Sequence, residues 1–197
     1  TLADLKDRRD IPVLTDEFEA EGMDGLFLAG EVTGRALIRT AISQGTAVAD
    51  EVAGRIEHCV GGSGGDGESH SASVFDLCVV GAGPAGLAAA LRARERGLNF
   101  IVLEQESIGG TVAKYPRRKL VMTQPVVLPI YGKLKRTSYS KEELMELWEG
   151  LARKFELPVQ CGVELLAVER TDRDIFHVRT SRGELLCRHL CLALGRR

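Results

Sequence analysis

The sequence lacks the features that mark nucleic-acid-binding, membrane-spanning and secreted proteins. Its formal net charge is −2, so it has no basic excess with which to bind nucleic acid. No signal peptide is visible. The most apolar stretch, residues 77–91, is interrupted by three glycines and a proline and is too short to cross a bilayer. These absences predict a cytoplasmic globular protein that binds neither nucleic acid nor membrane.

The cysteines and histidines indicate neither a disulfide framework nor a metal site. The five cysteines are odd in number, irregularly spaced and without a CxxC pair, which is typical of reduced thiols in a cytoplasmic protein. Cys187 and Cys191 share one face of an expected strand, but lie too far apart there to form a disulfide. The histidines show no metal-ligand spacing, so we predict no metal site. No residue can be assigned as a redox disulfide or an acid–base catalyst.

Composition divides the chain into three parts, and both ends suggest a piece of a longer polypeptide. The chain starts with Thr1 and stops after an apolar run at Arg197. Residues 60–73, VGGSGGDGESHSAS, are rich in glycine and serine without an apolar period, which predicts a flexible linker. We call residues 1–59 the first segment and residues 74–197 the second segment.

The second segment has the pattern of an α/β fold. Two short apolar runs flank a helical stretch, as in a βαβ unit, and Gly97 follows the helix where a left-handed residue is favoured. Ser140 is a good N-cap, with Glu142 and Glu143 in the first turn of the next helix. We predict strands over 75–80 and 100–103, helices over 84–96 and 140–155, a long loop over 105–139, and a small antiparallel β-meander over 163–169, 175–180 and 184–194.

The strongest motif is GAGPAG at residues 81–86, which fits GxGxxG between a strand and a helix. Gly81 permits the tight turn, Gly83 lets the backbone approach a pyrophosphate, and Gly86 lets the helix pack closely on the strand. Pro84 suits the first helical turn, and the free N–H groups there suit phosphates. The pattern predicts a dinucleotide site in a Rossmann-type parallel sheet. An ordinary strand–helix turn is the alternative.

Glu104 supplies the acidic residue that a dinucleotide-binding unit needs. It ends the second expected strand, 23 residues after Gly81, where a carboxylate about 20 residues from the motif accepts hydrogen bonds from a ribose diol. The alternative is a solvated charge at a strand end.

These residues resemble a known flavoprotein family. VVGAGPAG at 79–86, with Leu103-Glu104 and GGT at 109–111, is similar to the pyridine nucleotide–disulfide oxidoreductase superfamily, in its thioredoxin-reductase-like size class. The stretch IGGTVAKYP at 108–116 resembles the branch that includes bacillithiol-disulfide reductases. The resemblance implies that the first Rossmann unit binds FAD and that the GGT stretch lies along the flavin. It also implies a backbone contact between Val168 and the adenine.

Two further stretches carry the same resemblance. LALG at 192–195 is similar to the family's "ATG" segment, with Leu194 in place of threonine. GLFLAGE at 25–31, followed by a helical pattern over 36–56, is similar to the family's C-terminal FAD motif. There Glu31 stands where the family has an aspartate that binds the ribityl chain, and the helix start near Leu37 would point N–H groups at the flavin. The alternative for this helix is plain amphipathic packing.

The motifs and the resemblance together predict these cofactor-binding residues: Gly81, Gly83, Pro84, Ala85, Gly86, Glu104, Gln105, Gly110, Thr111, Val168, Ala193, Gly195, Gly30, Glu31, Leu37 and Ile38.

The two FAD motifs occur in the reverse of the family's order. One interpretation is a tandem protein, in which the first segment ends one flavoprotein module and the second begins the next. A 14-residue glycine-rich linker also reaches far enough for the two segments to pack as one permuted FAD domain. If so, we expect Leu26 and Leu28 to contact the strand at 77–79 or its neighbours.

The predicted function is FAD binding within a flavin-dependent oxidoreductase that uses NAD(P)H in the intact protein. The electron acceptor is expected to be a disulfide or another small molecule, and a homodimer is one possible assembly. The fragment alone is expected not to turn over. Two alternatives stay open: a non-catalytic FAD-binding scaffold or sensor, and an NAD(P)-binding oxidoreductase without flavin.

Overall fold

The computed structural model describes residues 13–34, 37–60, 74–122, 125–134, 136–172 and 174–195. Its helices are η1 (Gly30–Thr33), α1 (Ile38–Val60), α2 (Pro84–Glu95), η2 (Gly110–Lys114) and α3 (Lys141–Lys154). Its strands are β1 (Leu26–Leu28), β2 (Phe75–Val80), β3 (Phe100–Glu104), β4 (Leu120–Met122), β5 (Val127–Leu128), β6 (Gly132–Lys133), β7 (Ser138–Ser140), β8 (Val159–Cys161), β9 (Leu165–Arg170), β10 (Phe176–Thr180) and β11 (Gly183–Leu192).

A seven-stranded, mostly parallel sheet forms the centre of the fold, in the order β8-β3-β2-β11-β10-β9 with β1 also paired to β11. Strands β8, β3, β2, β11 and β1 are parallel, whereas β9, β10 and the first half of β11 form an antiparallel meander. The predicted α/β class, with a Rossmann-type parallel sheet and a small β-meander, is confirmed. The sequence predicts β11 only as a strand of the meander, whereas in the structure it also pairs with β2 in the parallel sheet.

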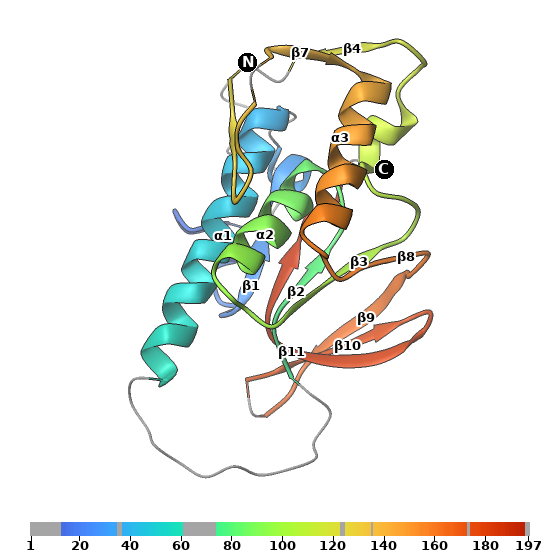
Figure 1. The fold of residues 1–197 in the computed structure, drawn as a ribbon. Coiled ribbons are helices and arrows are strands. Elements are labelled where there is room, and N and C mark those ends of the chain that lie inside the picture. The colour runs from blue at the N-terminus through green and yellow to red at the C-terminus, as the bar shows by residue number, and fades with distance from the viewer. Residues whose placement is uncertain are drawn as a thin grey trace.

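Side-chain alternation divides the core between the two faces of the sheet. Leu77 and Val79 of β2 belong to the same buried cluster as apolar residues of α1, α2 and α3, and Figure 1 shows these three helices in front of the sheet. Cys78 and Val80 point the other way and pack with buried residues of the meander, such as Phe176. Both faces of β2 are therefore covered, as is usual for a strand inside a parallel sheet.

Several boundaries differ from the sequence predictions. The expected loop over 105–139 contains η2 and the short strands β4 to β7, which pair as β4–β7 and β5–β6. Strand β8 at Val159–Cys161 was not predicted. Helix α3 begins at the predicted N-cap, Ser140. The Ser140 hydroxyl accepts from the Glu143 N–H, and the Glu143 carboxylate accepts from the Ser140 N–H. The expected linker lies outside the described residues, except for residue 60, with which α1 ends.

The first segment lies in the same sheet as the second. In β1, Leu26 pairs with Leu190 and Leu28 with Leu192 of β11, which itself pairs with β2. Helix α1 packs along α2, where Asp50 of α1 accepts hydrogen bonds from Arg92 and Arg96 at 2.6–2.9 Å.

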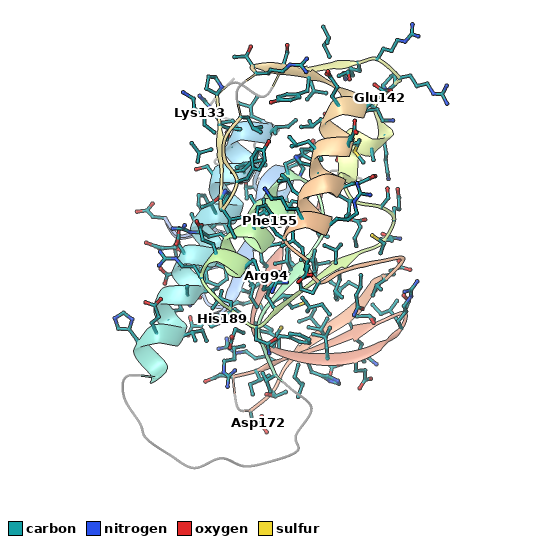
Figure 2. The ribbon with its side chains drawn as sticks, in the orientation of Figure 1. Arg94, Lys133, Glu142, Phe155, Asp172 and His189 are labelled. Atoms are coloured by element: carbon teal, nitrogen blue, oxygen red, sulfur yellow. The ribbon has the colours of Figure 1, made fainter. Side chains whose placement is uncertain are left out.

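Two further polar contacts join β11 to β2 and α2 to the end of α3. Nδ1 of His189 in β11, labelled in Figure 2, donates to the Asp76 carbonyl oxygen at 2.9 Å, and burial lowers the pKa of this imidazole. Because a carbonyl oxygen only accepts, Nδ1 carries the proton. Arg94 of α2 donates to the Glu156 carbonyl just after α3, which connects these two helices (Figure 2).

Candidate functional site: a cavity at the carboxyl edge of the sheet

The carboxyl ends of four parallel strands open onto one cavity. Because β1, β2, β3 and β11 run in the same direction, the residues that follow them meet at one edge, where ligands of open α/β sheets bind. Gly30, Gly81, Gln105 and Ala193 follow these strands, and all four line a cavity of about 440 Å³.

The glycine turn between β2 and α2 forms the floor of this cavity. Gly81 has a φ of +109°, and a Cβ there would lie 2.5 Å from the Ala193 carbonyl oxygen, so only glycine fits. Gly83 precedes α2 in an extended conformation and Pro84 occupies the first turn, with no side chain capping this helix end among the described residues. The first N–H groups of α2 are thus available to an anionic ligand.

Gly86 has a structural position and does not line the cavity. A Cβ on Gly86 would lie 1.8 Å from the Gly81 carbonyl oxygen and 3.2 Å from a methyl group of Val79. This agrees with the role predicted for the third glycine, which is close packing of the helix on the strand.

Glu104 lies beside the glycine turn with its carboxylate held in place. It is 8 % exposed, Oε2 accepts from the Ala82 N–H at 2.7 Å, and Oε1 accepts from the Glu106 N–H at 2.8 Å. A carboxylate has about four acceptor positions. Glu104 therefore keeps acceptor capacity on both oxygens toward a ligand in the cavity.

The segment after β3 crosses over the glycine turn. The Gly109 N–H donates to the Ala82 carbonyl at 2.9 Å. Gly110, with a φ of +54°, comes so close that a Cβ on it would lie 3.2 Å from the Gly83 Cα. Thr111 lies beside the segment that follows β11, since a Cβ on Gly195 would lie 2.7 Å from the Thr111 Oγ1. Small residues thus let three backbone segments meet around the cavity.

The first segment contributes one wall of the cavity. Gly30 and Glu31 of η1 line it, together with Leu37 and Ile38 at the start of α1. Leu37 is 62 % exposed although it lines the cavity, so its side chain lies at the cavity mouth. The amino end of α1 faces the cavity and adds a second positive helix-dipole end to that of α2.

The structure brings together all the predicted site residues except Gly86 and Val168. Val168 lies in β9, where it pairs with Val178 of β10 and is 37 % exposed. It is outside the cavity, and the predicted backbone contact with an adenine has no support from its position. The residues just before β9 and at its start line the cavity instead: Val163, Glu164 and Leu165.

Sequence reasoning missed several other lining residues: Ala41, Val80, Leu103, Glu106, Ser107, Val112, Lys114, Tyr115 and Leu194. Most directly neighbour predicted residues in the sequence, so wider motif boundaries would have included them. Lys114 and Glu106 form an ion pair of 2.8 Å with both side chains more than half exposed, which places this pair at the rim.

The described cysteines lie away from the cavity lining. Cys78, Cys187 and Cys191 are buried in the sheet, and burial raises the pKa of the Cys191 thiol to about 12. Cys161 is exposed at the end of β8. Within the described ranges, no helix combines the length and apolar character needed to cross a membrane.

Comparison with known proteins gives a family match over the second segment. Residues 78–196 match the family model "Pyridine nucleotide-disulphide oxidoreductase". An uncharacterized CzcO-like oxidoreductase of Geobacillus kaustophilus is 29 % identical over 127 residues, which are 62 % of this chain and 36 % of the relative. Thioredoxin reductase of Ureaplasma parvum is 55 % identical over 40 residues, which are 20 % of this chain and 13 % of the relative.

A solved structure shows the same fold. Bacillithiol disulfide reductase from Staphylococcus aureus superposes with a TM-score of 0.56 at 19 % identity, over 62 % of this chain and 38 % of that one. The chain matches about a third or less of the length of the curated relatives. The family resemblance drawn from the motifs is confirmed.

Proposed function

The chain belongs to the pyridine nucleotide–disulphide oxidoreductase family, and on this basis we propose that it forms the FAD-binding part of an NAD(P)H-dependent flavin oxidoreductase. The family implies FAD and NAD(P)H as cofactors and oxidoreduction as the class of reaction. The chemistry that FAD supplies in such an enzyme is the transfer of electrons from NAD(P)H to a disulfide or another acceptor.

One observation carries the proposal. The cavity at the carboxyl edge combines a GxGxxG turn, a buried strand-end carboxylate and a second helix start from a different part of the chain. A simple nicotinamide-binding unit needs only the first two. The wall formed by η1 and α1 is what favours a flavin dinucleotide, because it extends the cavity beyond the turn that serves the pyrophosphate.

The residues present fit the parts of FAD. Gly83 and the start of α2 suit the pyrophosphate, because Gly83 has no side chain and no side chain caps this helix end among the described residues. Glu104 suits the adenosine ribose, because its carboxylate is held by two backbone N–H groups and still has acceptor positions. Gly110 and Thr111, together with the start of α1, would hold the flavin end.

The protein's own contribution is positioning and electrostatics. The amino end of α1 would stabilise negative charge that develops on a bound, reduced cofactor, since the helix dipole is positive there. Tyr115 and Leu37 would exclude water from the mouth of the cavity. The acceptor, a homodimer and a cytoplasmic location stay predictions.

A reconstitution experiment tests the proposal. The purified chain is mixed with FAD, passed over a desalting column and examined for absorption bands at about 375 and 450 nm, the region expected for oxidised flavin. A parallel sample with NAD⁺ in place of FAD is the control, and mass spectrometry of the nucleotide released on denaturation shows whether it was retained. Retention of FAD supports the proposal. Retention of NAD⁺ alone would favour a nicotinamide-binding protein, and retention of neither would contradict the assigned site.

A further inference from the structure

A buried glutamine closes a ring of hydrogen bonds behind the cavity wall. Gln44, in the second turn of α1, is 3 % exposed. Its Oε1 accepts from the Gly30 N–H at 2.8 Å, and its Nε2 donates to Thr33 Oγ1 at 3.0 Å. The Thr33 hydroxyl donates to the Gly30 carbonyl at 2.8 Å. The ring therefore begins and ends on the peptide groups of one residue, Gly30.

The orientation of the amide in this ring is determined by its partners. The Gly30 N–H can only donate, so the oxygen of Gln44 must face it and the nitrogen must face Thr33. The hydroxyl of Thr33 then accepts from Gln44 and still has its own proton for the Gly30 carbonyl. Each buried group in the ring has a partner of the right kind.

The ring holds the turn that carries Glu31 into the cavity. Gly30 begins η1 with a φ of +84°, and a Cβ there would lie 3.1 Å from the Ala85 Cβ at the start of α2. Glu31 follows immediately and lines the cavity. The turn is thus pressed against α2 and hydrogen-bonded to α1, so that its position depends on both helices.

We propose that Gln44 is a positioning residue for the FAD site, which it serves through the Gly30–Thr33 turn without touching the cofactor. The inference rests on the proposed FAD binding. Gln44 does not line the cavity, but it bonds to the turn that does. The neutral amide of Gln44 accepts from the Gly30 N–H through its oxygen and donates to the Thr33 hydroxyl through its nitrogen, which neither a carboxylate nor an ammonium group could do.

The test compares Gln44→Met with Thr33→Val and with the double variant. Methionine keeps the length of the side chain and removes both hydrogen bonds. We expect FAD binding to weaken roughly tenfold to a hundredfold in Gln44→Met and less in Thr33→Val. The double variant should bind no more weakly than Gln44→Met alone, because both changes break the same ring. The visible circular dichroism of bound flavin should change in Gln44→Met.

Val48→Ala is the matched control, since Val48 is fully buried one turn further along α1 and outside the ring. It should lower the melting temperature while leaving FAD affinity and the flavin spectrum unchanged at a temperature where all variants are folded. If Gln44→Met binds FAD with wild-type affinity and spectrum, the positioning role is overturned and FAD binding stands. If the wild-type chain itself binds no FAD, the proposed function fails and the role of Gln44 fails with it.

Discussion

Helices α1 and α2 cross where Gly45 meets Ala85, and only glycine fits at position 45. A Cβ on Gly45 would lie 2.0 Å from the Ala85 carbonyl oxygen and 3.1 Å from the Ala89 amide nitrogen. Gly45 belongs to α1 in the first segment, and Ala85 belongs to α2 in the second. The close approach places the start of α1 beside the glycine turn, so the two FAD motifs face one cavity although they occur in reversed order.

The first prediction concerns this crossing. Gly45→Ala should push α1 and α2 apart and lower the free energy of unfolding by at least about 1–3 kcal/mol, because an overpacked interior must shift its backbone. Urea denaturation of the purified variant measures the loss.

Gly54→Ala provides the control on the same helix. Nothing lies within 4 Å of a Cβ at Gly54, so alanine there should raise the free energy of unfolding by roughly 0.5–1 kcal/mol through higher helix propensity. Equal stability of the two variants would mean that the helices do not cross as closely as described.

The second prediction concerns the buried carboxylate. Each oxygen of Glu104 accepts from one backbone N–H, and Glu104→Gln replaces one of these oxygens with an NH₂ group that can only donate. We expect FAD affinity to fall about tenfold or more, and the free energy of unfolding to fall by roughly 1–3 kcal/mol. Isothermal titration with FAD and urea denaturation measure the two effects.

Glu149→Gln is the matched control for that experiment. Glu149 is exposed on α3 and does not line the cavity, so its substitution should change neither quantity. Unaltered FAD binding by Glu104→Gln would show that the carboxylate does not contact the dinucleotide.

The third prediction is a pH dependence of stability that comes from Glu19. Its carboxylate accepts two hydrogen bonds from Arg55, at 2.6 and 2.9 Å, and one from the Gly25 N–H at 2.6 Å. The Arg55 guanidinium holds the pKa of this carboxyl below its usual value of 4.5. A group with a lowered folded pKa stabilises the protein fully above its unfolded value and loses that contribution as the pH falls through the folded value.

Glu19→Gln should therefore lower the free energy of unfolding by about 1–3 kcal/mol at pH 7. The difference from the wild type should shrink as the pH falls below 4.5. Denaturation curves between pH 3 and 7, chosen as roughly the range in which carboxyl groups titrate, measure this. Glu17→Gln, two residues away and exposed, should show no such trend. A pH-independent difference would argue against the ion pair.

The fourth prediction concerns thiol reactivity. Cys161 is exposed, whereas Cys78, Cys187 and Cys191 are buried. A hydrogen bond with Cys187 and burial both raise the pKa of the Cys78 thiol. Iodoacetamide should label Cys161 at least about a hundredfold faster than the three buried thiols in the native protein, because only an accessible thiolate reacts.

Peptide mass spectrometry identifies the labelled positions, and urea should remove the difference between them. Rapid labelling of Cys191 in the native protein would contradict the placement of β11 in the centre of the sheet.

The glycine motif and its flanking strands could be predicted because local constraints dominate there. Strand β2, the turn at Gly81 and the helix start at Pro84 each have a sequence signal that does not depend on distant contacts. The end of β3 at Glu104 was predicted for the same reason. These elements occur where they were expected.

The elements that were missed depend on long-range contacts. Strand β8 has three residues and becomes a strand only because β3 offers it an edge. The strands β4 to β7 are too short to show an alternating pattern. Gln44 would be taken for a solvated residue on a helix, and only the fold shows that it is buried beside Gly30.

Strand β1 obtains its partner, β11, from almost the opposite end of the described chain, with Leu26 beside Leu190. During synthesis, β1 therefore leaves the ribosome long before β11 exists, and its fully buried Phe27 must stay without its final surroundings until then. Contacts so distant in sequence slow folding and prolong the exposure of apolar surface. Chaperone demand during translation should accordingly depend on the arrival of β11.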